Sequence, residues 1–221
     1  MTGAPYNYPA KAAFGRVIPK NRIYEHGHLG KALRERFVAQ VDRITWAWKL
    51  APETTNLPEA QGVQEIQIIE LQQRSKDLDT PILLAIDKVI PKPILFHLRY
   101  GDQVRMAAAH KRPSEADGSK WVIGEHYVGD WYPETADRQA LPIALDLQGL
   151  YEQLLRGLLP RPARPGESIA AHLERVEAIR RHERERARLD AQLQRERQFN
   201  RKVALNAQLR TLKAEIDRLA S

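Results

Sequence analysis

The C-terminal segment constrains the fold most, because residues 168–220 have the pattern of one uninterrupted helix. An apolar stripe marks each of its ends. The first stripe comprises Ile169, Leu173 and Val176. The second is spaced four, three, four, three, as the seam of a coiled coil requires, and comprises Leu205, Leu209, Leu212, Ile216 and Leu219. We expect a helix about 80 Å long at ~1.5 Å per residue, whose stripes need partners because an isolated helix has little stability of its own.

Most of the excess positive charge belongs to the same segment. From residue 161 to the C-terminus there are 15 Lys and Arg against nine Asp and Glu, whereas residues 1–160 hold 20 and 19. The net charge of +7 favours acidic partners but says nothing about the fold. The arginines of the middle part spread around the helix between glutamates, so Glu–Arg pairs three or four residues apart explain this charge most simply. Weak contact with nucleic acid is an alternative, and the arginines that would make it are Arg180, Arg181, Arg184 and Arg188.

The chain contains no cysteine, which excludes disulfides, thiolate zinc sites and cysteine nucleophiles. This composition fits a reducing compartment. The N-terminus lacks the apolar core of a signal peptide, and no apolar run approaches the roughly 20 residues that a bilayer-spanning helix needs. We therefore expect a soluble cytoplasmic protein without membrane contact.

Residues 1–160 alternate between helical and strand patterns, which predicts an α+β body. After an irregular lead, the apolar residues of segment 31–44 recur at helical spacing. Segment 44–50 then switches to period two, which places Trp46 and Trp48 on one face of a strand. We expect both tryptophans to lie in the core rather than to stack on bases.

Further strand and helix patterns follow in the body. Strands are predicted at residues 63–71, 94–100, 104–110 and 121–128, and helices at residues 79–90 and 147–158. In the first of these strands the apolar residues change parity at Ile68 and Ile69, which indicates a bulge or a strand buried on both faces. The proline-rich segment 161–167 predicts a stiff hinge between the body, 1–160, and a helical arm, 168–221. The predicted fold is thus a mixed β-sheet body with packed helices, followed by a long C-terminal helix with coiled-coil character.

Carboxylates in the predicted strand 63–71 suggest an enzymatic alternative. Glu65, Glu70 and Gln72 lie on this strand or at its end, next to a helix that contains Lys88. Two carboxylates a few ångströms apart can hold Mg²⁺ and orient an attacking water, which would make the protein a metal-dependent nuclease. Glu65 and Glu70 differ in parity, however, so only a bulge would bring them to the same face.

No other catalytic or cofactor motif is apparent. His26 and His28 could bind a divalent ion, but no third ligand follows at a familiar spacing, so we interpret them as exposed loop residues. Gly101 is an isolated turn glycine and not part of a phosphate-binding loop. We expect no cofactor, and Mg²⁺ only if the nuclease alternative holds.

Several phrases together carry a family resemblance: PKNRIYEHGHLGKALRERFVAQVDRITWAWKLAPETTNLP, EIQIIEL, IDKVIPKPILFHL, LDLQGLYEQLLRGLLP and RQFNRKVALNAQLRTLKAEIDRL. They resemble a family of bacterial proteins classified only as a domain of unknown function. Members of that family are typically encoded beside helicase and DNA methyltransferase genes, in loci of the restriction or anti-phage type. The resemblance implies an accessory subunit of a DNA-processing assembly and supplies no active site.

The leading hypothesis is a non-catalytic adaptor that docks on a helicase or a DNA methyltransferase through its body and its helical arm. A body without a catalytic motif and an arm with two unpaired stripes motivate it. An exposed Phe in a charged helix needs a pocket to enter, so we expect the partner surface at Phe199, Asn200, Arg201 and Lys202 together with the second stripe. Self-association through the same helix is an alternative use of that stripe.

Overall fold

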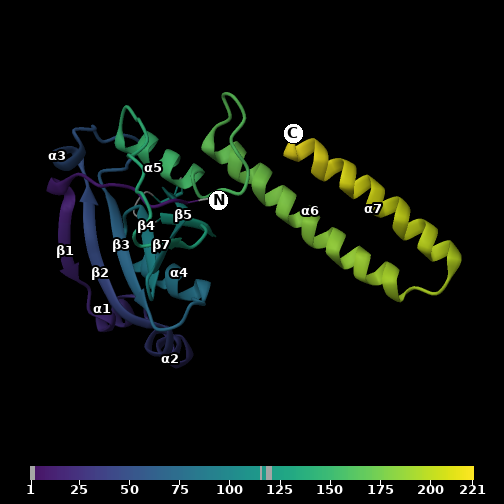
Figure 1. Ribbon diagram of the computed structural model, residues 1–221, viewed down its shortest axis with the longest axis horizontal. Helices are drawn as coiled ribbons and strands as arrows, with labels where there is room; N and C mark the ends of the chain where they lie inside the picture. Colours follow the sequence, from purple (N-terminus) through teal and green to yellow (C-terminus); the bar gives the residue numbers. More distant parts are fainter. Residues whose placement is uncertain (1–2, 115, 118–120) are drawn as a thin grey trace. The chain divides into compact units, whose positions relative to one another are not determined.

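The computed structural model describes residues 3–114, 116–117 and 121–221. The chain divides into two compact units, residues 1–159 and residues 160–221. Figure 1 gives the labels of the helices and strands. The first unit contains a β-sheet with packed helices, and the second contains two long helices.

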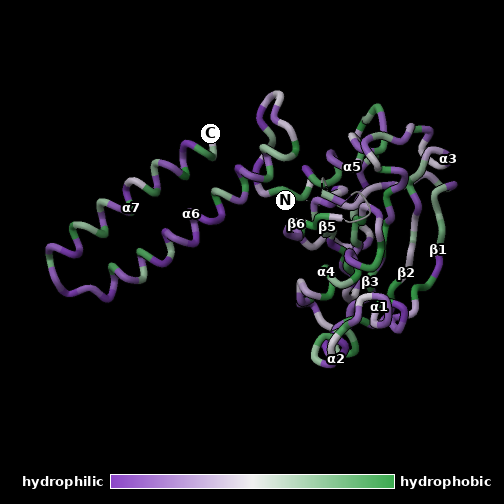
Figure 2. The backbone as a smooth tube through the Cα atoms, turned by 180° about the vertical axis from the view of Figure 1, so that it is seen from behind, coloured by the Kyte–Doolittle hydropathy of each residue, from purple (hydrophilic) through white to green (hydrophobic). Residues whose placement is uncertain are grey.

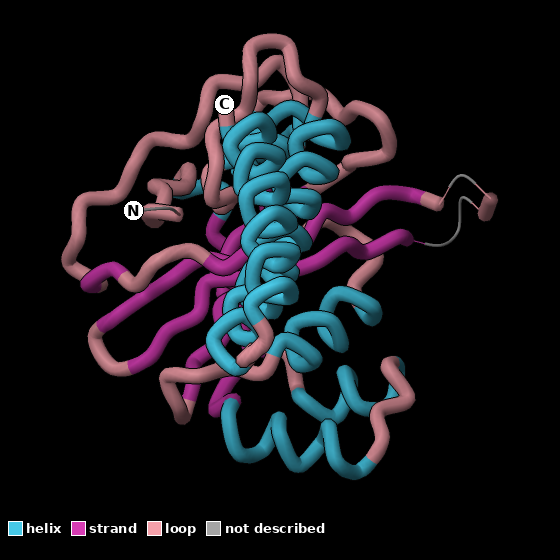
Figure 3. The backbone as a smooth tube through the Cα atoms, turned by 90° about the vertical axis from the view of Figure 1, so that its right-hand side faces the viewer, coloured by secondary structure: helices cyan, strands magenta, loops and turns pink. Residues whose placement is uncertain are grey.

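One mixed sheet organises the first unit (Figures 1 and 3). Its strands in the described part of the chain are β1 (Ala13–Val17), β2 (Val41–Leu50), β3 (Ile66–Gln73), β4 (Ile94–Tyr100), β5 (Gln103–Pro113), β6 (Trp121–Val128) and β7 (Tyr132–Pro133). They follow the order β1-β2-β3-β4-β5-β6, and β7 pairs with β5. The pair β3–β4 is parallel and the other pairs are antiparallel. Helix α4 (Thr80–Val89) connects β3 with β4, because parallel neighbours need a crossover connection.

The main core lies between the sheet and three helices, α1 (Lys20–His26), α2 (Lys31–Gln40) and α4. Ile23, Phe37 and Ile86 of these helices pack on Ile69 and Phe96 of the sheet. Complete burial of one such side chain contributes about 1.5–3 kcal/mol. The 3-10 helix η1 (Ala10–Ala12), α3 (Pro52–Thr55) and α5 (Leu147–Arg156) complete the first unit.

The first predicted helix is shorter than expected. Helix α2 ends at Gln40, and β2 begins at Val41 instead of at Ile44. The β-branched residues Val41, Ile44 and Thr45 explain the difference, because their stiff side chains favour a strand over a helix.

The prediction that the two tryptophans share one face is wrong. The register of β2 against β3 shifts between them, so Trp46 lies opposite Ile69 and Trp48 opposite Ile68. Successive residues of a strand point to opposite faces. Trp46 accordingly packs on the main core, whereas the Trp48 ring lies 4.9 Å from the Tyr8 ring on the other face. Both tryptophans are half-buried in the body.

Strand β3 is buried on both faces, which was one of the two predicted explanations of its apolar pattern. Ile68 and Ile69 are both fully buried. Its register with β4 is continuous over residues 67–72. The irregularities lie instead in β2, between Val41 and Arg43 and between Trp46 and Trp48.

Several other predicted elements are confirmed. Helix α4 begins after Asp79, with a proline in its first turn. Strands β4 and β5 form a hairpin through Gly101 and Asp102, where Gly101 has a φ of +58°. Strand β6 has the predicted bounds, and α5 ends at Arg156, two residues earlier than expected.

The C-terminal unit is a hairpin of two helices and not one uninterrupted helix. Helix α6 (Ile169–Arg195) and helix α7 (Phe199–Ala220) run antiparallel, side by side (Figures 1 and 2). Glu196 to Gln198 connect them. The Glu196 carboxylate accepts the backbone N–H groups of Arg197 and Gln198, at 2.8 and 2.9 Å, which stabilises the turn. The predicted fold class is confirmed, with the arm folded back on itself.

The open end of the hairpin is held by an ion pair. Arg175 donates from Nε and Nη2 to the two carboxylate oxygens of Glu167, at 2.7 and 2.8 Å. Both side chains are at least nine-tenths buried. The guanidinium groups of Arg164 and Arg175 also donate to the carbonyl of Leu219, at 3.1 and 3.3 Å. Cations at the C-terminal end of a helix satisfy its last carbonyls, so this Glu167–Arg175 clasp fixes the end of α7 beside the start of α6.

Candidate functional site

The structure separates the residues of the predicted nuclease site. Glu70 lies between the core residues Ile69 and Leu71 and therefore points to the face opposite α4. There its carboxylate binds Nη1 of Arg99 at 3.0 Å. Gln72 has the parity of Glu70 and shares its face.

Glu65 lies on the other side, just ahead of β3. It accepts a hydrogen bond of 2.6 Å from Nε2 of Gln67, which has the parity of Ile69. Lys88 is exposed on α4. No bulge in β3 reunites Glu65 with Glu70, so these four residues do not form one site.

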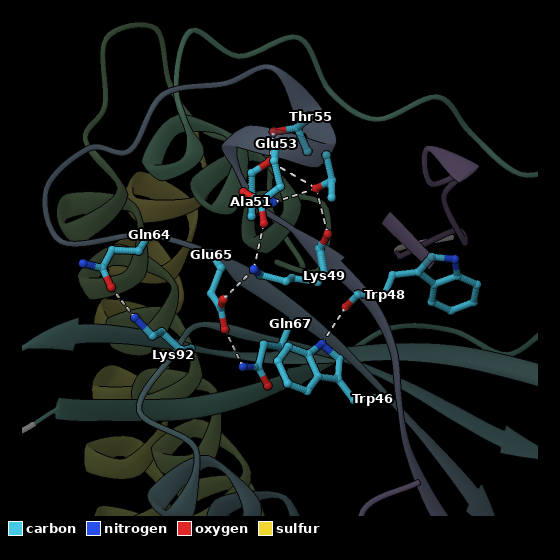
Figure 4. Close-up of polar contacts among 11 residues, drawn as sticks. Trp46, Trp48, Lys49, Ala51, Glu53, Thr55, Gln64, Glu65, Gln67 and Lys92 are labelled. Carbon is cyan, nitrogen blue, oxygen red and sulfur yellow. Dashed lines mark hydrogen bonds and ion pairs between the residues drawn. The ribbon is translucent and has the colours of Figure 1, made fainter. Parts of the chain in front are cut away.

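A different cluster surrounds Glu65 (Figure 4). The Lys49 ammonium, at the end of β2, lies 2.7 Å from Oε1 of Glu53 and 3.7 Å from Oε2 of Glu65. Gln67 is 94% buried and orients the Glu65 carboxylate through the bond from its amide. We call Lys49, Glu53, Glu65 and Gln67 the carboxylate cluster.

Helix α3 positions Glu53 in this cluster. The Thr54 hydroxyl accepts the backbone N–H of Ala51 at 2.8 Å and donates to the Lys49 carbonyl at 2.8 Å. These bonds fix the turn that follows β2, and Pro52 begins the helix with a φ suited to that place. Glu53 therefore stands one helical turn from the end of β2, beside Lys49.

One ammonium group lies between the two carboxylates of the cluster. The hydrogen bond from Lys49 lowers the pKa of Glu53, and the same bond raises the pKa of Lys49. The Glu65 side chain is 16% exposed and that of Glu53 61%, so the cluster opens to solvent on the side of Glu53. Carboxylate and amide oxygens are ligands that Mg²⁺ and Ca²⁺ accept. In this structure the Lys49 ammonium is the positive charge beside the two carboxylates. Across the described residues, no group of three or more His, Cys, Asp and Glu is arranged to hold a metal ion.

Sequence reasoning missed Glu53. The predicted elements include no helix at residues 51–58, although proline is favoured at the first position of a helix. His26 and His28 are exposed, as predicted.

A second group of charges in the body is closed to solvent. The Lys111 ammonium lies 3.3 Å from Oδ1 of Asp87, and Nε2 of His126 lies 2.7 Å from Oδ2 of the same carboxylate. All three side chains are at most 2% exposed. Burial lowers the pKa of Lys111. This triad cross-links α4, β5 and β6 and is out of reach of a substrate.

The hairpin contains the predicted partner surface, and its parts differ in exposure. Phe199 is 77% exposed where α7 begins, and Val203, one turn later, is 51% exposed. Asn200, Arg201 and Lys202 are also exposed. The second stripe behaves differently: Ile216 is buried, and Leu205, Leu209, Leu212 and Leu219 are half-buried.

Helix α6 accounts for the partial burial of the second stripe, because α6 and α7 pack along their length. The expectation that this stripe lacks any partner is therefore wrong. The adjacent helix of the same chain covers one side of it and leaves the other side open.

Four of the arginines of α6 lie along one edge, whereas Arg180 and Arg186 lie on other sides of the helix. Arg181, Arg184, Arg188 and Arg195 are separated by three, four and seven residues, so they share one edge of the helix. All four are exposed. Arg188 has a carboxylate partner, Glu185, at 2.9 Å. Arg180 lies on another side of the helix, away from this basic edge.

The chain was compared with protein families, curated proteins and solved structures. The family model described as Domain of unknown function (DUF4391) matches residues 6–216, which is nearly the whole chain. The resemblance to a family of unknown function is thereby confirmed. No curated protein and no solved structure gives a significant match. Within the described residues, no helix combines the length and the apolar character needed to span a bilayer.

Proposed function

For this chain, which belongs to the family of unknown function DUF4391, we propose the role of a non-catalytic adaptor. The adaptor is a subunit of a bacterial DNA-processing assembly of the restriction or anti-phage type. It docks on a helicase or a DNA methyltransferase. The hairpin is its principal docking element, and the body supplies a stable platform.

The observation that carries this proposal is the exposure of Phe199 at the turn of a charged hairpin. An aromatic side chain that is 77% exposed gains the most from insertion into a pocket of another protein. Arg201 and Lys202 stand next to it and would contact acidic groups at the rim of such a pocket. The ion pair of Arg201 with Glu196, at 3.8 Å, is long and exposed and offers little competition.

Recovery of the partner from the native host tests the adaptor role. The full chain, with an affinity tag, is expected to co-purify with a helicase or a DNA methyltransferase, and Phe199→Asp is expected to abolish that recovery. Val38→Asp is the matched control, because Val38 is exposed to a similar degree, 57%, on α2 of the body. Recovery of neither enzyme by the unaltered chain, or equal recovery by Phe199→Asp, would refute the proposal.

A second candidate function is cation-dependent cleavage of nucleic acid at the carboxylate cluster. It is favoured by one observation, the approach of Glu53 and Glu65 to the same ammonium group. A divalent cation that displaced Lys49 would meet two carboxylates and could orient an attacking water. Mg²⁺ would be the cofactor of this function, and the adaptor needs none.

Incubation of the purified chain with DNA and Mg²⁺ or Mn²⁺ separates the two functions. The adaptor predicts no cleavage. The second candidate predicts cleavage that Glu53→Gln and Glu65→Gln abolish. Glu70→Gln is the matched control, because it changes a carboxylate of the same strand on the opposite face, and loss of cleavage in that control alone would contradict the second candidate.

A further inference from the structure

The two helices of the hairpin leave a groove between them. Its main part has a volume of about 840 Å³, and a second hollow of about 410 Å³ continues it toward the turn. The apolar residues of the two parts are Leu189, Ala207 and Leu212 in the first and Ala204 and Leu205 in the second. Gln192 and Gln208 line both hollows, so the two parts are continuous. Figure 2 shows the apolar positions that recur along both helices.

Arginines line the outer edge of the groove on its α6 side, where Glu185 also lies, 2.9 Å from Arg188. Arg188 lines the main part and Arg195 lines the second hollow. Arg181 and Arg184 continue the same edge toward the open end of the hairpin, where they line a separate hollow together with Glu174 and Glu177. From Arg181 to Arg195 the edge extends about 21 Å, at ~1.5 Å per residue. The α7 side has Thr211 and Glu215 in the main part and Arg201 in the second hollow.

We infer that this groove binds an amphipathic helix of a partner protein that has acidic residues along one flank. The inference rests on the proposed adaptor role and names the chemistry of the partner segment. An apolar groove between two helices accepts a third helix, whose apolar residues recur at i, i+3, i+4 and i+7. Carboxylates on the flank that faces α6 complement the four arginines. A neutral or basic opposite flank suits Glu215 in the main part of the groove.

Two other occupants fit the groove less well. A second copy of the hairpin would bring together two units that each have an excess of six positive charges, and like charges oppose that association. Nucleic acid would meet leucine and alanine side chains in the groove, and no Phe, Tyr or Trp side chain lines it for base stacking.

Peptide binding to the full chain tests the groove. The probe is a fluorescent synthetic helix of about four turns, with Leu at i, i+3, i+4 and i+7 and Glu along one flank. We expect binding that weakens at least about tenfold in the variant Arg184→Glu/Arg188→Glu, because two attractions become repulsions. A peptide with Lys in place of Glu should prefer this variant to the unaltered chain. Ala207→Arg, which fills the groove without touching the basic edge, should weaken both peptides.

Lys213→Glu is the matched control, because Lys213 lies on the side of α7 away from the groove residues Gln208 and Leu212. It should bind the acidic peptide within about twofold of the unaltered chain, since the change is remote and exposed. No binding of the acidic peptide, equal binding of the acidic and basic peptides, or displacement of the acidic peptide by a single-stranded oligonucleotide would overturn the inference.

The failure of this inference is distinguishable from the failure of the adaptor role. Suppose that Arg184→Glu/Arg188→Glu recovers the helicase or methyltransferase as well as the unaltered chain does, while Phe199→Asp does not. The groove inference then falls and the adaptor role stands. If the unaltered chain recovers neither enzyme, the adaptor role falls, and the peptide measurements still decide what the groove binds.

Discussion

Replacement of Glu167 by Gln should loosen the hairpin and remove part of its dependence on pH. The hydrogen bond from Arg175 lowers the pKa of Glu167 from 4.5 to about 2. That displacement corresponds to about 3 kcal/mol, at ~1.4 kcal/mol for each unit of pKa. The glutamine amide oxygen can still accept one hydrogen bond from Arg175, so we expect Glu167→Gln to lower the free energy of unfolding by about 1–2 kcal/mol at neutral pH.

The sign of the pH dependence follows from the lowered pKa. Below about 4.5 the unfolded chain binds a proton at Glu167 that the folded chain does not yet bind, so the contribution of the clasp is full at neutral pH and falls between pH 4.5 and about 2. Urea unfolding, monitored by hydrogen exchange of the α7 amides, measures the free energy of unfolding of both chains at pH 7 and at pH 3. The difference between the unaltered chain and Glu167→Gln should be smaller at pH 3.

Glu185→Gln is the control for the clasp. Glu185 also forms an ion pair, with Arg188 at 2.9 Å, but both side chains are more than two-fifths exposed. Its loss should change the free energy of unfolding by less than about 0.5 kcal/mol. Equal effects of the two substitutions, or a Glu167→Gln effect that does not depend on pH, would refute the reasoning.

Three further predictions concern the body. His97 is fully buried, and burial lowers its pKa to about 3. As the pH falls below about 6.5, the unfolded chain therefore binds a proton at this residue before the folded chain does, and the folded state loses stability. His97→Gln should reduce this loss of stability between pH 6.5 and 3, as measured by thermal unfolding. Asp87→Asn leaves the buried Lys111 ammonium without its carboxylate and should cost about 3–5 kcal/mol in urea unfolding, and an effect below about 1 kcal/mol would contradict a charged Lys111. Gly101→Ala places a side chain at a φ of +58° and should destabilise the β4–β5 hairpin by about 1 kcal/mol, whereas Gly30→Ala, at a φ of −67° in open space, should not.

Much of the fold was predictable because hydrophobic periodicity and turn chemistry are local. The start of α4 at Asp79 and the β4–β5 turn at Gly101 follow from such signals. The shift between Trp46 and Trp48 was not predictable, because the intervening residue, Ala47, has no turn preference and the shift is defined only by the pairing with β3.

The turn of the hairpin was missed for a related reason. Residues 196–198 contain neither glycine nor proline, and the helical pattern continues through them. Two interactions favour the end of α6 at this point. The Glu196 side chain accepts hydrogen bonds from two backbone N–H groups, and α7 buries apolar side chains by packing along α6. The packing of α7 on α6 is a tertiary interaction, which the local sequence does not reveal.

The candidate sites were predictable only in part. Glu65 was found because carboxylates on a strand are conspicuous, but its neighbour in space is Glu53 and not Glu70. The partner of Glu65 depends on how the segment between β2 and β3 folds, and that is set by the bonds of Thr54. The basic edge of α6 could be predicted only from the positions of the arginines around the helix axis, and their number alone does not show it.

The return of α7 along α6 has a consequence for how this unit can vary. Both of its ends meet at the Glu167–Arg175 clasp, and its turn is the farthest point from them. Insertion of seven residues into each helix would lengthen the unit by about 10 Å and preserve the phase of the facing side chains. The length of the hairpin is therefore independent of the clasp that holds its ends, and relatives could differ in length while they retain the clasp.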